Sequence, residues 1–478
     1  MLFNSLEFLI FFPIVVALYY ALPHKNRWAL LLIASCYFYM VFVPIYILIL
    51  GFTIVVDYFA GIWLEDAKGR KRRLLLIASI IANTGVLAIF KYYNFLNENL
   101  TVLLKGFSVQ NPIPFLSILL PIGLSFHTFQ AMSYTIEVYR GNQKAERNFG
   151  IYALYVMYFP QLVAGPIERP QNMLHQFHEE KFLSFENFAE GLKHIVWGLF
   201  KKVVIADRIS EYVNVVYGDP HQYGGAQLLM ATIFFSFQIY CDFSGYSSIA
   251  IGTSRIFGIR LMQNFNRPYL SSSIREFWHR WHISLSTWFR DYLYFPLGGN
   301  RVAIPRAYLN TFIVFVVSGL WHGANWTFVI WGALHGFYQI FGKLTQPARD
   351  RFNTLIGMNK IPGIHKTIQI AITFMLASFA WIFFRARSLD DAMYIVTHIF
   401  SVRTFQNLNL FEFRADMVMG VLLIILLMLL DVLEEKIKIS EKLRLSPSAV
   451  RWTVYGVSVL ALMIFGIWKS ADFIYFQF

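Results

Sequence analysis

The sequence predicts an all-α polytopic membrane protein with roughly 10–12 transmembrane helices, at about 20 residues a crossing. Composition, long windows free of charge and the spacing of basic loops all indicate this fold class. The 478 residues are 57% hydrophobic and 14% charged, with a mean hydropathy of +0.50. Soluble domains carry about 25% charged residues. A water-soluble enzyme, a disordered chain and a DNA-binding protein are therefore disfavoured.

The net charge of +13 does not require a nucleic-acid partner, because cytoplasmic membrane loops are rich in Lys and Arg. Cys36 and Cys241 both lie in apolar runs, so we expect neither a disulfide framework nor a metal site. No basic segment precedes the apolar stretch Phe8–Leu22. We therefore interpret this stretch as a retained span and not as a cleaved signal peptide.

Six further windows contain no Asp, Glu, Lys or Arg and are the next predicted spans: Leu74–Phe90, Ile113–Ile136, Phe149–Ile167, Thr367–Phe384, Met417–Leu430 and Trp452–Trp468. Trp28–Leu64 is too long for one crossing, and Pro44 and Gly51 offer places to divide it. Gln222–Ser254 and Ala307–Gly342 are also longer than one crossing requires. No internal repeat is visible.

Basic clusters follow the first, third and fifth predicted spans: Lys25 and Arg27, then Lys68–Arg73, then Arg140–Arg147. Basic loops face the cytoplasm, so this alternation predicts an extracytoplasmic N-terminus. The later loops have mixed charge and do not decide the orientation.

Two stretches are not predicted to be spans. Glu168–Lys193 has scattered acidic residues and Pro170, which favours amphipathic helices at the surface. Ser271–Arg301 is aromatic and basic, and a single helix there would align four residues on one face: Arg275, His279, His282 and Ser286. This stretch is either an interfacial anchor or a helix that brings His282 into a polar cavity.

Ala307–Gly342 has 36 residues and no formal charge, so one straight helix would exceed the bilayer core. We expect a break within Ser318–Asn325, between two half-length helices. Non-helical backbone at membrane depth must be buried in protein or line a wet cavity. His322, at this break, is the strongest candidate for a proton-transfer residue. The alternative is a structural histidine bonded to a carbonyl group that the break leaves free.

Other ionisable residues lie in apolar windows. We expect His335 to be a packing residue, and His127 is a weaker candidate for a cavity role. Asp57 and Asp242 must be paired, protonated or hydrated. For Asp242 we expect an ion pair with an arginine of the 275–301 stretch. The sequence has no GxSxG, GxxxxGK[ST], HExxH or CxxC motif, which argues against a nucleotide-driven pump and a zinc protease.

Two histidine motifs identify a family. REFWHRWHISLSTWFRDYLYFPLGGNR, followed by SGLWHGANWTFVIWGALHG, resembles the membrane-bound O-acyltransferase family, in particular its bacterial branch concerned with alginate O-acetylation. PIGLSFHTFQ, MYFPQLVAGPIERP and YCDFSGYSSIAIG are similar to the same branch. The resemblance extends from the N-terminus to about Arg385. It implies one domain over residues 1–478, with a motif-bearing core at 115–345 and C-terminal helices at 367–478.

The resemblance also implies a site. His322 would be catalytic and His282 would support it. A central polar tunnel, surrounded by spans and re-entrant helices, would bind substrate through Ser286, Asp291, Asn300, Trp321 and Asn325. The protein would lie in a bacterial inner membrane and would hold no bound cofactor or metal.

The expected reaction is acyl transfer across the membrane. Acetyl-CoA would donate from the cytoplasm, and the acceptor would be an extracytoplasmic polysaccharide or a partner transferase that modifies it. His322 would act as general base, with Asn325 or a backbone N–H group at the helix break near the oxyanion. A covalent acyl-His322 intermediate, transfer of a D-alanyl group, a transporter and a scaffold without chemistry are the alternatives.

Overall fold

The computed structural model is built of helices joined by turns and loops, with no strand among the residues it describes. Those residues are 1–116, 121, 123–401, 414–468 and 473–474. Within them, seven helical segments are long and apolar enough to cross a membrane, and α1 (Leu6–Ala21) is a shorter apolar helix. The predicted all-α polytopic fold class is therefore confirmed.

The first of the seven segments is Pro44–Asp66, which joins the 3₁₀-helix η1 (Pro44–Tyr46) to α3 (Ile47–Asp66), and the second is Gly69–Gly106. The other five are α12 (Gly225–Ile256), α15 (Ile304–His322), α18 (Pro362–Arg385), Ala415–Ile437 within α20 (Arg414–Ile437), and α22 (Ser448–Phe465). The predicted division of Trp28–Leu64 at Pro44 is confirmed, since α2 (His24–Met40) ends just before it. Seven segments among the described residues are fewer than the roughly 10–12 expected.

Part of the difference comes from Phe149–Ile167, which was predicted to span. The chain forms α7 (Phe149–Met157) and the single turn α8 (Phe159–Leu162), with Tyr158 non-helical between them. Pro160 lies in the first turn of α8 and cannot continue α7, because it has no backbone N–H group. Nearly every residue from Ile151 to Ile167 is buried within the protein. This apolar window is therefore internal packing and not a lipid-facing crossing.

The window Ile113–Ile136 is also not one helix. Residues 117–120 and 122 lie outside the described residues, and residues 113–116 are not helical. Helix α6 (Leu124–Arg140) starts after Gly123, whose φ of +75° is in the left-handed region that favours glycine. A Cβ atom at Gly123 would also crowd the carbonyl oxygen of Leu162.

The chain divides into two compact units. Unit 1 comprises Met1–Ile195 and Tyr246–Met262, and unit 2 comprises Val196–Gly245 and Gln263–Phe478. Helices α10 (Phe185–Leu199) and α12 each contribute residues to both units. Unit 2 also contains α15, α18, α20 and α22, together with α11 (Asp207–Gly218), α13 (Ile274–Arg280), α14 (Ile283–Phe289), α16 (Trp326–Leu344), α17 (Gln346–Leu355), α19 (Leu389–His398) and α21 (Ile439–Leu445).

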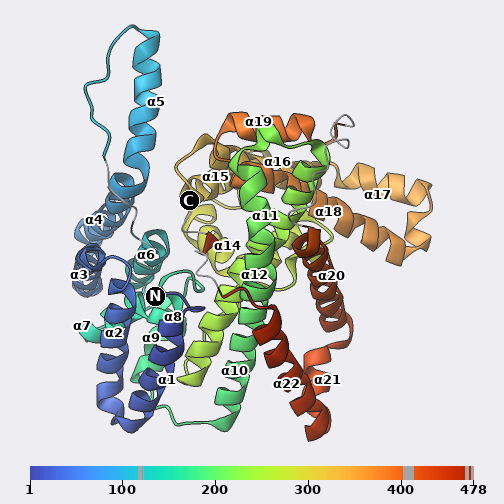
Figure 1. The fold of residues 1–478 in the computed structure, drawn as a ribbon. Coiled ribbons are helices and arrows are strands. Elements are labelled where there is room, and N and C mark those ends of the chain that lie inside the picture. Colours follow the sequence, from blue (N-terminus) through green and yellow to red (C-terminus); the bar gives the residue numbers. More distant parts are fainter. Residues whose placement is uncertain (117–120, 122, 402–413, 469–472, 475–478) are drawn as a thin grey trace. The chain divides into compact units, whose positions relative to one another are not determined.

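Unit 1 contains a helical segment of 38 residues, Gly69–Gly106. It runs through α4 (Gly69–Leu87), the π-helical turn η2 (Ala88–Tyr92) and α5 (Tyr93–Gly106), and Figure 1 shows the chain returning alongside α5. Asn94 and Asn97 bind this returning segment: their amide groups donate to the carbonyl oxygens of Leu116 and Ile113, at 2.8 and 3.1 Å. The polar face of α5 is thus turned toward its own chain, and apolar side chains such as Val102 are exposed.

In unit 2, α15 and α16 form an antiparallel hairpin with the break between them. Helix α15 ends at His322 and α16 begins at Trp326, so the predicted break within Ser318–Asn325 is confirmed. Each helix has 19 residues, about 28 Å at 1.5 Å per residue. The expectation of two half-length helices is therefore wrong. Gly319 and Gly332 allow the close approach, because a Cβ atom at either would overlap a carbonyl oxygen of the opposite helix.

The 271–301 stretch is not the single helix that was predicted. Helix α13 ends at Arg280, α14 starts at Ile283, and a π-helical turn η6 (Arg290–Tyr294) follows. His282 lies at the break with a φ of +43°, a left-handed conformation that is costly for a residue other than glycine. Arg275, His279, His282 and Ser286 therefore do not share one helical face.

Candidate active site

His322, the last residue of α15, is buried among aromatic side chains. Its exposed fraction is 4%, and its ring centroid lies 4.9 Å from that of Trp321, 5.0 Å from that of Trp331 and 5.2 Å from that of Phe384. These rings come from α15, α16 and α18, so three helices fix the imidazole. Gly323 continues in an extended conformation, which ends the helix directly after His322.

His282 is also close to Trp321. Its ring centroid is 6.3 Å from that of Trp321 and 4.6 Å from that of Phe243 of α12. The side chain is fully buried, and this burial lowers the pKa of His282 to about 3. The imidazole is therefore neutral at physiological pH. The structure thus brings the two predicted histidines to the same aromatic cluster, with Trp321 in contact with both.

Asn264 holds the turn that contains His282. Its Oδ1 atom accepts hydrogen bonds from His282 Nδ1 at 3.2 Å, from the backbone N–H of Ser284 at 3.2 Å and from Ser284 Oγ at 2.9 Å. Its backbone carbonyl accepts the N–H of Ile283 at 2.9 Å. Sequence reasoning missed Asn264, because the only signal is a polar residue between Met262 and Phe265, 18 positions before His282.

The predicted substrate-binding residues differ in their placement. Trp321 is close to both histidines. Asn325 caps α16 by accepting the N–H of Thr327 at 3.0 Å, and it donates to Arg387 O at 3.3 Å. Ser286 follows on α14 and donates to Trp281 O at 3.3 Å. Asp291 pairs with its neighbour Arg290, and Asn300 is exposed on the turn that follows η6.

The other two candidate histidines have structural contacts. His335 is fully buried among aromatic rings, and its Nδ1 accepts the indole N–H of Trp278 at 3.2 Å. This agrees with the predicted packing role. His127 belongs to unit 1, where its Nδ1 lies 3.1 Å from the carbonyl oxygen of Gly123.

Asp242 is paired, but not with the predicted arginine. Lys202 Nζ lies 2.8 Å from Asp242 Oδ1 and 2.9 Å from Asp207 Oδ1, and the backbone N–H of Ile474 donates to Asp242 Oδ2 at 2.8 Å. The expectation of an arginine from the 275–301 stretch is wrong, because the lysine comes from the π-helical turn η3 (Phe200–Ala206) that precedes α11. The predicted structural ion pair itself is confirmed.

Asp57 is held by neutral donors in unit 1. The hydroxyl group of Ser79 donates to Asp57 Oδ1 at 2.6 Å, and the amide of Asn83 donates to Oδ2 at 2.8 Å. Both donors lie on α4, whereas Asp57 lies on α3. The contacts thus link the two helices of this hairpin.

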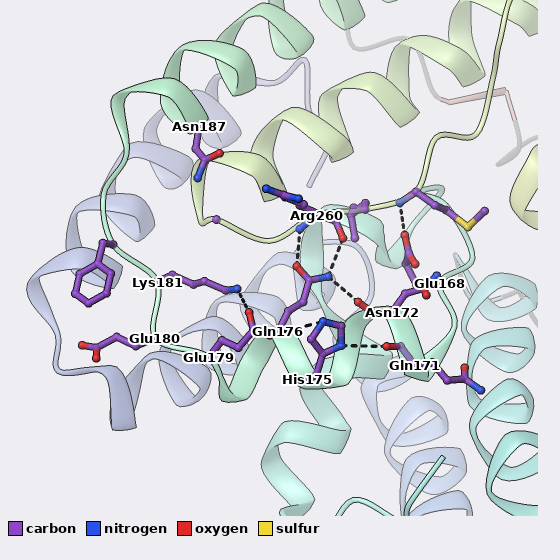
Figure 2. Close-up of a pocket in the computed structure, with 14 residues that line it drawn as sticks. Glu168, Gln171, Asn172, His175, Gln176, Glu179, Glu180, Lys181, Asn187 and Arg260 are labelled. Carbon is purple, nitrogen blue, oxygen red and sulfur yellow. Dashed lines mark hydrogen bonds and ion pairs between the residues drawn. The ribbon is translucent and has the colours of Figure 1, made fainter. Parts of the chain in front are cut away.

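A cavity of about 620 Å³ lies in unit 1 and was not predicted. Figure 2 shows its lining from α9 (Pro170–His178), the following segment and residues 258–262. Gln176 exchanges two hydrogen bonds with the backbone of Arg260, at 2.8 and 2.9 Å, and Glu168 accepts the N–H of Met262. Burial raises the pKa of Glu168 to about 7. These contacts hold residues 258–262 against α9. The cavity therefore belongs to unit 1, whereas both His282 and His322 belong to unit 2.

Comparison with known proteins identifies the same family as the motifs. Residues 145–384, half of the chain, match the family model of membrane-bound O-acyltransferases. The chain is 39% identical over 409 residues to a probable alginate O-acetylase of Pseudomonas aeruginosa, covering 85% of this chain and 76% of the relative. It is 36% identical to a peptidoglycan O-acetyltransferase of Helicobacter pylori, over 77% of this chain and 72% of the relative.

A more distant relative is a teichoic acid D-alanyltransferase of Bacillus subtilis, 29% identical over 50% of this chain and 64% of the relative. The resemblance stated from the motifs is therefore confirmed. Bacterial relatives and the apolar helices are consistent with a multi-pass protein of the inner membrane. The chain belongs to the membrane-bound O-acyltransferase family and is an O-acyltransferase of the membrane.

Proposed function

We propose that this protein transfers an acetyl group from acetyl-CoA in the cytoplasm to an extracytoplasmic hydroxyl group, for the O-acetylation of a cell-envelope polysaccharide. The observation that carries this proposal is the buried His322 at the tip of the α15–α16 hairpin, with Trp321 close to both His322 and His282. An imidazole in this position can take and return a proton. The names of the relatives, which include alginate and peptidoglycan as polymers, support a polysaccharide acceptor.

The sequence alone left the later loops undecided, but the helix ends that the structure defines support an orientation for the site. Basic residues cluster around the start of α15, at the end of α16, on α17 and around the start of α18: Arg301, Arg306, Lys343, Arg349, Arg351, Lys360 and Lys366. Because cytoplasmic segments carry the excess of Lys and Arg, these ends face the cytoplasm. His322, at the opposite end of α15, is then close to the extracytoplasmic side, where an acceptor hydroxyl group arrives. The same basic segments attract the phosphate groups of the donor.

In the reaction, His322 accepts the proton of the acceptor hydroxyl group as its oxygen attacks the carbonyl carbon of the thioester. The carbon–oxygen bond forms, the carbon–sulfur bond breaks, and the thiol leaves with the proton that His322 returns. The acceptor hydroxyl group belongs either to the polysaccharide or to an extracytoplasmic transferase that passes the acetyl group on. The family supplies a second candidate acyl group, since one relative is named for D-alanyl transfer.

His322→Ala and His322→Gln test the proposal in proteoliposomes supplied with acetyl-labelled CoA thioester on one side and a glycan acceptor on the other. Loss of the general base should reduce acyl transfer by about 10²–10⁴-fold. His279→Ala is the matched control, because His279 is exposed on α13. Variants should elute as the wild-type protein does from a sizing column. Acetylation at the wild-type rate in both His322 variants would exclude the proposed role.

A further inference from the structure

The hydrogen bonds of Asn264 determine which nitrogen of His282 carries the proton. Three donor groups converge on Asn264 Oδ1, and one of them is the backbone N–H of Ser284, which can only donate. The atom that it meets must therefore be the amide oxygen and not the amide nitrogen. An amide oxygen only accepts hydrogen bonds, so the Nδ1 atom of His282 must present an N–H group to it.

The environment keeps the His282 ring in its neutral form. The side chains of Asn264, His282 and Ser284 are all fully buried, and the rings of Phe243 and Trp321 pack against the imidazole. A neutral imidazole carries one N–H group. With that group on Nδ1, the Nε2 atom of His282 has a lone pair and no proton, so it can accept a hydrogen bond but cannot donate one.

We infer that Asn264 is a positioning residue for acyl transfer, which holds His282 as the Nδ1–H tautomer with Nε2 as a proton acceptor. This inference rests on the proposed function. It assigns His282 to the acyl acceptor and not to the thioester. The unprotonated Nε2 accepts a hydrogen bond from the hydroxyl group of the acyl acceptor and so orients its oxygen. It does not stabilise the developing oxyanion of the thioester carbonyl, because that role requires an N–H donor.

The backbone at His282 agrees with this role. The left-handed φ of +43° is maintained by hydrogen bonds of the two residues that follow His282, from Ile283 N–H to Asn264 O and from Ser284 N–H to Asn264 Oδ1. A conformation of this kind persists only when its surroundings fix it, and such conformations cluster at functional sites. Asn264 thus fixes both the direction of the His282 side chain and its tautomer, as partners behind a ligating or catalytic histidine do.

The direct test is nitrogen NMR of the full chain in lipid vesicles, with ¹⁵N-labelled histidine and with His282→Gln used to identify the His282 signals. The wild-type protein should show a protonated Nδ1 and a bare Nε2 at neutral pH. In Asn264→Leu, which removes the acceptor at similar volume, the proton should move wholly or partly to Nε2. A wild-type ring protonated at Nε2, or a pattern that Asn264→Leu leaves unchanged, would overturn the inference.

Acyl transfer tests the link to the reaction. Asn264→Leu should lower the rate by about 10–100-fold, as loss of a supporting hydrogen bond commonly does. Asn264→Asp keeps an acceptor oxygen in place and should retain more activity than Asn264→Leu. Ser284→Ala is the matched control: it removes one donor to the same oxygen, leaves the bond to His282 and should change the rate by less than about threefold.

The two measurements separate the possible failures. If the proton of His282 moves to Nε2 in Asn264→Leu but the transfer rate stays unchanged, the role of Asn264 in the reaction is overturned. The hydrogen bond from His282 to Asn264 would still stand. The proposed function itself is decided by the His322 variants and not by the NMR pattern, which needs no substrate. If Asn264→Leu does not fold, Asn264→Asp takes its place, because a carboxylate partner must shift the Nδ1 signal. An unshifted signal there would overturn the inference.

Discussion

Lys202 connects two buried carboxylates of unit 2, those of Asp207 and Asp242. The exposed fraction of each of these three side chains is 6% or less. Asp242 also accepts the backbone N–H of Ile474, and the neighbouring Phe473 packs on Phe243, with 5.8 Å between ring centroids. A chain of contacts therefore runs from this charge cluster through Phe243 to His282. The cluster supports the position of α12 behind the candidate active site.

Lys202→Met should destabilise the protein strongly, because it leaves two carboxylates buried without a cation. Removing one partner of a buried ion pair costs about 3–5 kcal/mol. The melting temperature of the purified protein in detergent measures the effect. Lys202→Met combined with Asp242→Asn should regain part of the loss, since one of the stranded charges is then neutral. A double variant no more stable than Lys202→Met alone would show that the ion pair is not the cause.

At this scale the sequence indicates candidate groups more readily than it indicates the residues that contact them. His322 was predicted because glycines flank it inside an uncharged window, which is a local signal. Lys202 and Asn264 were not predicted as partners, since they contact residues 40 and 18 positions away in the chain. A contact of this kind depends on how helices pack, and a single sequence does not encode it in any local pattern.

The α15–α16 hairpin depends on glycine at the two places where the helices approach most closely. Gly319 faces the carbonyl oxygen of Phe328, and Gly332 faces that of Phe315. His322 lies three residues after the first of these contacts. The distance between the two helices therefore determines where the imidazole lies relative to Trp331 on α16.

Gly319→Ala should push the two helices apart and lower both the stability and the transfer rate. Overpacking of this kind costs about 1–3 kcal/mol. Gly342→Ala on α16 is the control, because nothing lies within 4 Å of a Cβ atom there. That change should instead stabilise the helix, by about 0.5–1 kcal/mol. Melting curves of both variants measure the contrast, and equal shifts of the same sign would contradict the close approach of the helices.

Among the elements, the helix break at Ser318–Asn325 could be predicted and the one at His282 could not. The first has Gly319 and Gly323 and too many residues for one crossing. The second interrupts REFWHRWHISLS, which has neither glycine nor proline, and it is held by hydrogen bonds that Asn264 accepts. Tertiary contacts override helix propensity there, so the helical pattern misled the prediction.

For the whole molecule, composition predicts the membrane class correctly, but among the described residues fewer helices are long and apolar enough to cross than the uncharged windows suggested. An uncharged window such as Phe149–Ile167 is equally apolar whether it faces lipid or the protein interior. Only packing distinguishes the two cases. The orientation predicted from the Lys and Arg clusters is a separate expectation, which packing does not decide.

Cysteine labelling checks this orientation in unit 2. Asp350 on α17 follows the end of α16, whereas Asp390 on α19 follows the end of α18, and both residues are exposed. With Cys36 and Cys241 replaced by alanine, Asp390→Cys should react with a membrane-impermeant maleimide added to intact cells. Asp350→Cys should react only after the cells are made permeable. The reverse pattern would place His322 toward the cytoplasm and contradict the proposed path of the acceptor.

The uninterrupted rod from Gly69 to Gly106 has a consequence for what lies outside the cell membrane. At 1.5 Å per residue its 38 residues measure about 57 Å, whereas the hydrocarbon layer is about 30 Å thick. Even a tilt of about 40° leaves more than 10 Å of surplus. The positive-inside pattern predicts that Arg70–Arg73, at the start of this segment, lie on the inner side, and in that orientation the surplus emerges on the outer side. The end of α5 then extends past the hydrocarbon layer into the aqueous space beyond it.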